Sequence, residues 1–533
     1  MASYKKHVAT TKSVTKKIYG KDMVKNHAGG YSFKSDDFEV LKRWLLTGST
    51  SNSFYQSAEE KTDDNVENFR RCLSNNVDKT VDEILYATDN AINNHTSILA
   101  MVYLSMGNFY CKKKFKENFF KVIRTASHLY EFFSYCKEMR GMGKSIHNVV
   151  TKWLTKDLSE KDLEYQLLKY QQRGGWSARD VLRLIKPVPK TEKMSALFSW
   201  SVGKNNLTPE QLKEKGLTRV GTYEELKSLQ EYDTKEIASI IRSNNLTHEM
   251  IPANIKRDNE ILQALFERMP ITASLRNLAS YTEKGIFNDD KNIELLQERF
   301  SFENIKRGRV HPLTMCSAYK IYNAGGSLGK TSLRWIPNKK ILMVLEGAIE
   351  NSFKALETTG KHFYHALDIS GSMEWHANET LWLTSAEIAG IMALATVKSE
   401  PNFFAGAFSE KFSPLRNFTK DKKFDYAISG KYREGKHMGG TNAGSAVKYA
   451  IENGIKTDVF IFWTDNENWM GDHVSLLLEE YRNKINKDAK AIFVSIEANG
   501  ITSVDPKDKL SYDICGFNTN TVKLIQYITE GKF

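Results

Sequence analysis

Five oxygen-bearing side chains in the C-terminal third of the sequence could together hold a metal ion. Three of them follow the apolar run 362–367, one lies beside a pair of glycines, and one follows the apolar run 459–463. They are Asp368, Ser370, Ser372, Thr441 and Asp465. Carboxylate and hydroxyl oxygens are hard ligands, which suit Mg²⁺ or Mn²⁺ better than zinc or copper. The residue types therefore predict a divalent-cation site, with Mg²⁺ as the preferred ion and with room for an acidic or phosphate oxygen from a partner.

The elements that must position these ligands belong to a predicted α/β domain, residues 358–533. Apolar runs predict strands, and periodic patterns predict helices between them. The strands are expected at 362–368, 402–408, 458–464 and 490–496, and the helices at 380–398, 442–453, 473–485 and 519–529. Strands that alternate with helices form a doubly wound parallel sheet, whose carboxyl ends meet at one edge. We therefore expect the five ligands to converge at that edge.

The region before this domain, residues 36–357, shows the apolar period of helices over almost its whole length. No strand pattern of note interrupts it, and capping boxes predict helix starts at Thr208 and Thr222. Such a run of helices without a heptad repeat is typical of helix pairs stacked as a solenoid. Residues 1–35 are rich in lysine and lack an apolar period, so we expect a basic extended arm. This arm either touches RNA or only keeps the chain in solution.

Composition limits the classes to which this protein can belong. The chain has 533 residues, a net charge of +12 and five widely spaced cysteines. The odd number and the wide spacing of the cysteines indicate reduced thiols in the cytoplasm, not disulfides or a zinc ribbon. No apolar run is long enough to span a bilayer, and the N-terminus lacks the apolar core of a signal peptide. We expect a cytoplasmic monomer without a membrane partner, and the positive charge favours a polyanionic partner.

Basic residues gather in two parts of the helical region. In the first, residues 112–147, cations alternate with phenylalanines and tyrosines, and the part ends with Arg140, Lys144 and His147. Cations attract phosphates and aromatic rings stack on unpaired bases, so this part predicts an RNA-binding surface. The alternative is that the rings belong to the core, as most large rings do, and that the lysines are only solvated.

The second basic part is the stretch Leu168-Lys-Tyr-Gln-Gln-Arg-Gly-Gly-Trp-Ser177. Lys169 and Arg173 are four residues apart, which predicts that they share one face of a helix. The glycine pair at 174–175 predicts the end of that helix, and Ser177 is typical of the cap of the next one. This face is a second candidate for contacts with phosphates.

Several long stretches resemble the Ro ribonucleoprotein autoantigen family, whose domain is named TROVE, and the likeness runs over nearly the whole chain. Besides 168–177, they are Met269-Pro-Ile-Thr-Ala-Ser-Leu-Arg-Asn-Leu278, Arg309-Val-His-Pro312, Leu367-Asp-Ile-Ser-Gly-Ser-Met373, Thr464-Asp-Asn-Glu467 and Cys515-Gly-Phe517. The order Asp-x-Ser-x-Ser, Thr, Asp also resembles the metal-ion-dependent adhesion site of von Willebrand factor A domains. The resemblance implies a ring-like domain of HEAT-type helical repeats that is closed by a von Willebrand A domain. In similar sites the hydroxyls bind the ion directly and the two aspartates act partly through water.

The resemblance also implies RNA partners. Small noncoding Y RNAs bind the outside of such rings, and single-stranded 3′ ends of misfolded RNAs enter the centre. By motif match, the family positions for Y RNA binding fall on Lys169, Arg173 and Lys186. Lys186 stands where the family has a histidine, so the cation is kept and the imidazole is lost. Bacterial relatives can work beside a 3′ exoribonuclease, and no residue of this sequence decides whether this chain has such a partner.

Three classes of function compete. The leading hypothesis is a noncatalytic RNA-binding protein of a ribonucleoprotein particle, which serves RNA stabilisation and quality control. The alternative is a metal-dependent protein-adhesion scaffold that does not bind RNA. The third class is a nuclease. A two-metal nuclease needs several clustered carboxylates, whereas the predicted site has two carboxylates among three hydroxyls. We therefore expect no enzymatic activity.

Overall fold

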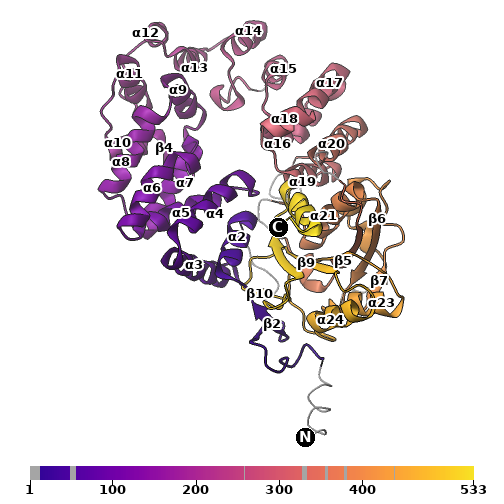
Figure 1. Cartoon of the computed structure of the whole chain (residues 1–533). Helices are drawn as coiled ribbons and strands as arrows, with labels where there is room; N and C mark the ends of the chain where they lie inside the picture. The colour runs from indigo at the N-terminus through magenta and orange to yellow at the C-terminus, as the bar shows by residue number, and fades with distance from the viewer. Residues whose placement is uncertain are drawn as a thin grey trace, which may run out of the picture.

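The chain folds into an arc of short helices and an α/β domain that lies between the two ends of the arc. The computed structural model describes residues 12–48, 56–256, 258–326, 333–353, 358–376, 381–436 and 439–532. In Figure 1 the helices run from α3 through α12 to α20 and return to the α/β domain, so that the ribbon makes a ring. The predicted fold class, a ring-like helical-repeat domain with a doubly wound α/β domain, is confirmed. The predicted boundary between these domains falls at 357, and residues 354–357 lie outside the described residues.

The helices of the arc are between 6 and 18 residues long. The first half consists of α2 (Asp37–Thr47), α3 (Ala58–Asn75), α4 (Val77–Asn90), α5 (His95–Met106), α6 (Phe109–Val122), α7 (Ala126–Met139), α8 (Lys144–Lys152), α9 (Glu160–Lys169), α10 (Ala178–Ile185) and α11 (Glu192–Ser201). The second half consists of α12 (Pro209–Glu214), α13 (Thr218–Ser228), α14 (Thr234–Asn244), α15 (Asn259–Glu267), α16 (Ile271–Glu283), α17 (Asp290–Arg299), α18 (Phe302–Arg307), α19 (Pro312–Asn323) and α20 (Lys339–Ser352). A π-helical turn, Trp153–Asp157, extends α8.

One of the two predicted capping boxes is confirmed and the other is wrong. Thr208 caps α12, and Gln211 completes its box. Thr222 instead lies inside α13, where its hydroxyl donates to the carbonyl of Thr218 at 2.8 Å. The same pattern of residue types occurs inside helices, because a threonine hydroxyl can bond to the carbonyl one turn before it.

The α/β domain is built on a six-stranded sheet with the order β11-β9-β8-β5-β6-β7. Its five parallel strands are β5 (His362–Asp368), β6 (Asn402–Phe408), β8 (Val459–Thr464), β9 (Lys490–Ser495) and β11 (Ser511–Cys515). The short β7 (Phe412–Pro414) pairs antiparallel with β6 at the other edge. The four predicted strands agree with the structure to within one residue. Sequence reasoning missed β7 and β11, which are short or mixed in polarity.

Helices cover both faces of this sheet, as a parallel sheet requires. They are α21 (Ser385–Ser399), α22 (Phe424–Ile428), α23 (Gly444–Glu452), α24 (Val474–Lys484) and α25 (Thr519–Glu530). Along β5, Phe363 and Leu367 pack with α21 and α25, whereas Tyr364 and Ala366 pack with α23 and α24. The helix predicted at 380–398 corresponds to α21, and residue 380 lies outside the described residues.

The α/β domain contacts both ends of the arc. Residues of α15 to α20 share one hydrophobic core with a face of the sheet, and the rings of Phe353 and Phe424 stack 5.4 Å apart. Next to the C-terminal helix, Asn518 donates to the carbonyl of Asn90 at 3.1 Å, and Thr519 donates to that of Ser352 at 2.8 Å. One short stretch before and at the start of α25 therefore joins the ends of α4 and α20, which closes the ring.

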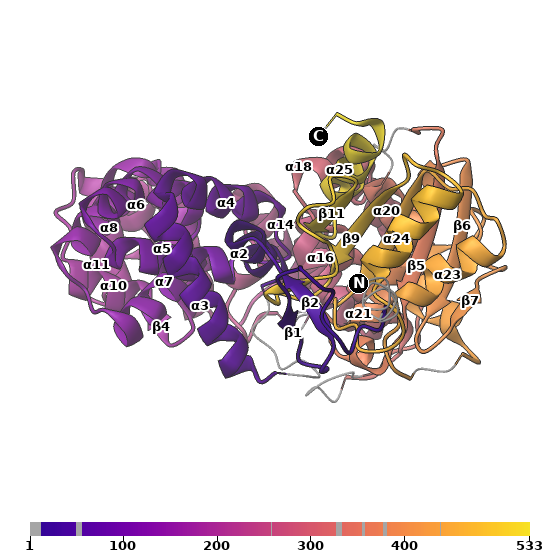
Figure 2. The ribbon, with the colours of Figure 1, turned by 60° about the horizontal axis from the view of Figure 1, so that its bottom comes forward.

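The N-terminal segment is docked onto the α/β domain over its described part, residues 12–35. It contains β1 (Val24–Lys25) and β2 (Tyr31–Lys34), and β2 pairs antiparallel with β10 (Ile501–Thr502). Figure 2 shows β1 and β2 at the junction of α2 and the α/β domain. We expected a basic arm without regular structure; the structure differs because Val14, Met23 and Phe33 are buried there. Residues 1–11 of the predicted arm lie outside the described residues.

None of the helices in the described parts of the chain combines the length and the apolar composition that crossing a bilayer requires.

Candidate metal centre and candidate RNA-binding surface

The five predicted metal ligands meet at the carboxyl edge of the parallel sheet. Asp368 is the last residue of β5, and Asp465 follows the last residue of the neighbouring strand β8. After β5, Ser370 precedes a 3-10 helical turn, Gly371–Glu374, that contains Ser372, and Thr441 lies on the loop that leads into α23. The backbone N–H of Gly371 donates to the carbonyl of Gly439 at 3.4 Å, which holds these two loops together. All five side chains are buried.

Short hydrogen bonds fix the orientation of the Asp368 carboxylate. One of its oxygens accepts from the backbone N–H of Ser370 at 2.9 Å, and the other accepts from the hydroxyl of Thr464 at 2.7 Å. The hydroxyls of Ser370 and Ser372 lie 3.2 Å apart. Sequence reasoning missed Thr464 as a positioning residue. The contacts with Ser370 and Thr464 therefore fix the direction in which each oxygen of the Asp368 carboxylate points.

The electrostatics of this edge favour a bound cation. Burial raises the pKa of Asp368 to about 6, and burial together with the charge of Asp368 raises the pKa of Asp465 well above its ordinary value. Neither aspartate forms an ion pair with a described lysine, arginine or histidine. The hydroxyl of Thr441 is buried, and no described group is its hydrogen-bond partner. Two close buried carboxylates and an unpartnered hydroxyl are a donor set that a divalent cation fits, because the ion offsets the charge and accepts the lone pair.

A buried glutamate links this edge to the docked N-terminal segment. The backbone N–H of Glu467 donates to the Asp465 carboxylate at 3.0 Å. The Glu467 carboxylate lies 2.7 Å from the Nδ1 atom of His27 and accepts from the backbone N–H of Ala28 at 3.2 Å. Asn26 donates to the carbonyl of Asn468 at 2.6 Å. The N-terminal segment therefore contacts the same loop that carries Asp465, a relation that local patterns in the sequence do not reveal.

The prediction that Lys169 and Arg173 share a helical face is wrong. The helix α9 ends at Lys169, and Arg173 lies in a hairpin of two short strands, β3 (Gln172–Arg173) and β4 (Trp176–Ser177). The turn residues Gly174 and Gly175 have φ angles of +53° and +77°. Two successive left-handed residues are typical of the tight type I′ turn that closes hairpins, and glycine adopts them without strain. This hairpin is also a short interruption of the helical region that we did not expect.

The hairpin nevertheless brings the two cations together around tyrosine rings. The Nζ atom of Lys169 lies 5.3 Å from the ring centre of Tyr165 and 5.4 Å from that of Tyr170. The Cζ atom of Arg173 lies 5.9 Å from the ring centre of Tyr170, and that of Arg219 lies 5.6 Å from that of Tyr165. We call these five residues the cation–tyrosine cluster. Sequence reasoning missed Arg219, which is distant along the chain at the start of α13.

The contacts of these cations are mostly with uncharged groups. Lys169 donates to the hydroxyl of Tyr165 at 3.1 Å, and Arg173 donates to the carbonyl of Gln172 at 2.9 Å. None of the three cations forms an ion pair with a carboxylate in the described parts of the chain. Arg173 is exposed, whereas Lys169 and Arg219 are half-buried. The Glu164 carboxylate accepts from the backbone N–H of Arg219 at 2.9 Å, so the cluster presents positive charge at the surface without a side-chain ion pair, not without acidic neighbours.

The other predicted RNA-binding residues lie at helix ends near the hairpin. Lys186 is the exposed residue that ends α10, in a left-handed conformation with φ of +50°. Arg140 follows α7, Lys144 opens α8, and His147 lies one turn further. The hairpin packs on α7, because the hydroxyl of Ser134 donates to the carbonyl of Gly174 at 3.2 Å. Lys144 is exposed, and Arg140 and His147 are half-buried.

Most aromatic residues of the part 112–147 belong to the core. Phe115, Phe119, Phe132 and Phe133 are buried, and the rings of Phe119 and Phe132 meet edge to face at 5.2 Å. Tyr130 is also buried. The alternative interpretation is therefore right for these rings, which cannot stack on RNA bases. Near this part, Tyr110 lies beside Lys114, and the cation–tyrosine cluster combines two tyrosines with three cations.

Comparison with known proteins agrees with this architecture. The family model of the TROVE domain matches residues 24–240 and 240–341, and that of the Ro60 vWA domain matches residues 362–529. A protein of Caenorhabditis elegans named RNA-binding protein RO60 is 30% identical over 590 aligned residues, which cover 96% of this chain and 90% of that protein. A protein of the same name from Deinococcus radiodurans is 25% identical, with 96% of each chain covered.

A solved structure shares the fold. The crystal structure of the Deinococcus radiodurans RO (RSR) protein superposes with a TM-score of 0.68 at 22% sequence identity, and the match covers 93% of this chain and all of that one. The helical ring, the sheet order and the family models over both domains lead to one assignment. This chain belongs to the Ro60 family, in which a TROVE domain is followed by a von Willebrand factor A domain.

Proposed function

We propose that this chain is a noncatalytic RNA-binding protein of a ribonucleoprotein particle. In this proposal, small noncoding RNA of the Y type binds the outside of the ring, and single-stranded 3′ ends of misfolded RNA bind in its centre. The particle would serve RNA stabilisation and quality control. Two relatives that align over 96% of this chain are named RNA-binding proteins, which supports the proposal.

The observation that carries the proposal is the cation–tyrosine cluster. Lys169, Arg173 and Arg219 supply three positive charges without ion-pair partners among the described residues, and phosphates supply the opposite charge. A guanidinium can bond to two phosphate oxygens at once, which a lysine cannot. The tyrosines hold the cations in place through cation–π contacts, so less side-chain freedom is lost when RNA binds. Lys186, Arg140, Lys144 and His147 would widen the same surface.

The proposed function is tested by removing two charges from this cluster. Glutamine at Lys169 and Arg173 keeps much of the length of both side chains and removes both cations. Each lost phosphate contact lowers the slope of log affinity against log salt concentration by roughly 0.7 to 0.9. We therefore expect weaker binding of a structured RNA and a slope that is lower by about two. Filter-binding titrations at several salt concentrations measure both quantities.

A matched control removes the same charge elsewhere. Lys448 and Lys487 are exposed on the α/β domain, and glutamine at both positions changes the net charge equally. This control should bind RNA with the slope of the unaltered protein. If the double variant at Lys169 and Arg173 also keeps its affinity and slope, the cluster is not the RNA site.

We also propose that the metal centre binds Mg²⁺. Ser370, Ser372 and Thr441 would be direct ligands, and Asp368 and Asp465 would act at least partly through water. The unpartnered hydroxyl of Thr441 supports this assignment. A bound Mg²⁺ keeps several exchangeable positions, so it could accept a carboxylate or phosphate oxygen from a partner.

The metal centre also supports the second candidate function, a protein-adhesion scaffold that does not bind RNA. In that case the ion would hold an acidic side chain of a partner protein, and the cation–tyrosine cluster would have no role. The ratio of absorbance at 260 and 280 nm of the freshly purified protein separates the two functions. Co-purified nucleic acid supports the RNA-binding function, and a protein-like ratio together with no RNA affinity supports the scaffold.

A further inference from the structure

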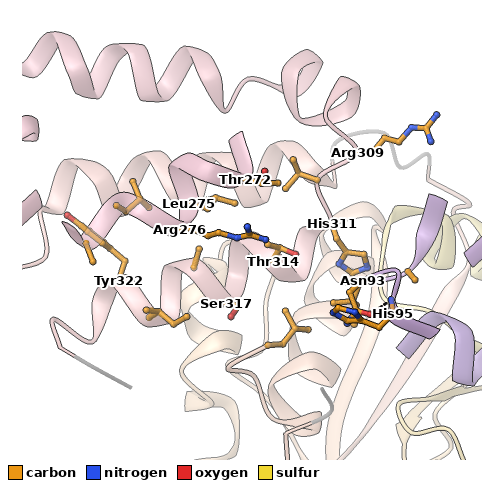
Figure 3. Close-up of a pocket in the computed structure, with 18 residues that line it drawn as sticks. Asn93, His95, Thr272, Leu275, Arg276, Arg309, His311, Thr314, Ser317 and Tyr322 are labelled. Atoms are coloured by element: carbon orange, nitrogen blue, oxygen red, sulfur yellow. Dashed lines mark hydrogen bonds between the residues drawn. The ribbon is translucent and has the colours of Figure 1, made fainter. Parts of the chain in front are cut away.

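Two cavities beside the helices α16 to α20 differ in charge. The larger, about 510 Å³, lies between the loop after α4 and the helices α16 and α19. Figure 3 shows Arg276, Arg309, His95 and His311 among its lining residues, and this basic character suits the RNA of the proposed function. The other, about 420 Å³, lies between α17 and α20, and its lining has more acidic than basic side chains. The RNA-binding function gives this second cavity no role.

The second cavity is a groove between two helices that run in the same direction on the outer side of the arc (Figure 1). Lys340 and Asp290 form an ion pair at 2.6 Å that joins the first turns of α20 and α17. Near the last turns, Asn351 donates to the carbonyl of Phe300 at 3.3 Å. The lining residues of α20 recur every three or four positions, so they share one face of that helix. We call this site the α17–α20 groove.

The groove offers apolar contacts and open space. Its lining includes the buried side chains of Ile293, Phe300 and Ala348, and Met343, of which 66% is exposed. Methionine is common on surfaces that bind apolar side chains, because its flexible thioether chain adapts to the ligand. Gly347 lies one turn after Met343, and a Cβ atom at this position would have no described atom within 4 Å. The groove therefore has room for apolar side chains of another molecule.

The charges of the groove favour a basic partner. Glu294 of α17 is exposed in the lining, and it forms no ion pair with a lysine, arginine or histidine in the described part of the chain. The charge of Lys340, the basic residue of the lining, is balanced by Asp290. Phosphates are repelled by such a lining, whereas an arginine or lysine of a partner is attracted. The groove is thus locally acidic, although the whole chain has a net charge of +12.

We propose that the α17–α20 groove binds a basic amphipathic helix of a partner protein. Apolar side chains of this helix, three and four residues apart, fill the space beside Met343 and Gly347, and an arginine or lysine pairs with Glu294. The helix α20 has 14 residues and is about 21 Å long, so it can contact about four turns of the partner helix. This inference goes beyond the proposed function, because it assigns a protein-binding site that needs no RNA.

The test begins with the peptides that the groove selects. A phage-displayed library of random peptides of about 16 residues, or about 24 Å as a helix, is selected on the full chain and counter-selected on the variant Gly347→Leu. Leucine fills the groove and is a better helix former than glycine, so the variant should keep its fold. The enriched peptides should have apolar residues three and four positions apart and more basic than acidic residues. Enrichment of acidic peptides, or of none that distinguish the two proteins, overturns the proposal.

The most enriched peptide, labelled with a fluorophore, is then titrated with the full chain and its variants by fluorescence anisotropy. Gly347→Leu should weaken its binding about tenfold or more, and so should Glu294→Lys, which replaces attraction by repulsion. Gly347→Ala is the control for helix propensity, because it adds one methyl group and should keep most of the affinity. Glu479→Lys is the control for charge, since Glu479 is exposed on α24, and it should change nothing.

Other occupants of the groove give different results. Dimerisation in analytical ultracentrifugation that Gly347→Leu abolishes would make a second copy of this chain the occupant and overturn the proposal. Peptide binding that both Gly347→Leu and Glu294→Lys leave unchanged also overturns it. Titration of a structured RNA should give the same affinity for Gly347→Leu and the unaltered protein, and a loss in the variant would assign the groove to RNA instead. Thermal melting shows whether each variant keeps its fold, and the exposed Glu294 carries the test if Gly347→Leu does not.

Discussion

Replacing Arg43 with methionine should weaken the joint between the helical arc and the α/β domain. Arg43 belongs to α2, and its side chain is fully buried. Its Nη1 atom donates to the carbonyls of Asn499 and Ile501, both at 3.0 Å, and its Nη2 atom pairs with the Asp513 carboxylate. Methionine fills similar space and makes none of these contacts. Asp513 then keeps the hydroxyl of Ser495 at 3.0 Å but loses its cation.

The expected loss follows from the cost of a buried charge without a partner, about 3 to 5 kcal/mol. Unfolding entropy is about 2.1 cal/mol/K per residue near the midpoint, or about 1.1 kcal/mol/K for the whole chain. A loss of about 4 kcal/mol should therefore lower Tm by about 4 °C if the ring unfolds as one unit. If the α/β domain, roughly a third of the chain, unfolds alone, the same loss should lower its Tm by about 11 °C. Differential scanning calorimetry distinguishes the two cases.

A matched control uses an exposed ion pair of the same helix region. Arg71 pairs with Asp37 at 2.9 Å, and 42% of the Arg71 side chain is exposed. Methionine at Arg71 should cost less than about 1 kcal/mol, because surface pairs contribute little. The double variant Arg43→Met with Asp513→Leu should recover part of the loss, since it leaves no buried charge. An Arg43→Met protein that melts within about 1 °C of the unaltered protein would refute the reasoning, because about 1 °C corresponds to only about 1.1 kcal/mol for a chain of this size.

Two further predictions concern the edge of the sheet. Valine at Thr464 removes the hydroxyl that bonds Asp368. It should weaken Mg²⁺ binding about tenfold with little change in fold, because hydrogen-bond partners of a metal ligand typically contribute that much. Calorimetric titration measures the Mg²⁺ affinity, and an unchanged affinity would show that Thr464 has no role in the metal centre. The hydrogen bond and charge of Glu467 raise the pKa of His27 above 6.5, so the protonated pair should stabilise the docked N-terminal segment at acidic pH, and this stabilisation should fade as the pH rises through the raised pKa. Limited proteolysis of the segment as a function of pH should show this trend, and the variant His27→Gln should abolish it; equal pH dependence in both proteins would contradict the assignment.

Strong local patterns predicted the architecture of the α/β domain well. The strand β8 is an uninterrupted apolar run up to Thr464, and the apolar run inside β5 is broken only by the buried His365, because both faces of the sheet are covered; such runs are easy to locate. Their alternation with helices predicted that the five candidate ligands meet at one edge, as they do. Whether they bind a metal ion stays a prediction. Thr464 was missed because its role depends on which oxygen of Asp368 it reaches, and a sequence pattern does not contain that geometry.

Short and long-range features were harder to predict. The pair Gly174-Gly175 fits both a helix end and a tight hairpin turn, and the strands on either side have two residues each, too few for a period to show. The cation–tyrosine cluster includes Arg219, which reaches Tyr165 only through the packing of α13 near α9. The N-terminal segment has no apolar period from which its structure could be predicted. Its order comes from the pairing of β2 with β10, which lies far along the chain. Tertiary contacts decide such elements, and local propensity does not.

The closure of the ring has a consequence for the order of events during synthesis. The hydrogen bond that joins Asn518 to Asn90 connects residues that are 428 positions apart. Ribosomes add roughly 5 to 20 residues per second, so the first helices wait roughly 20 to 90 s before their partner leaves the ribosome. Over that interval the helices of the arc can stack on their sequence neighbours, but the ends of α4 and α20 cannot yet be joined by α25. The nascent protein is therefore an open crescent until α25 has left the ribosome, and only then can the ring close.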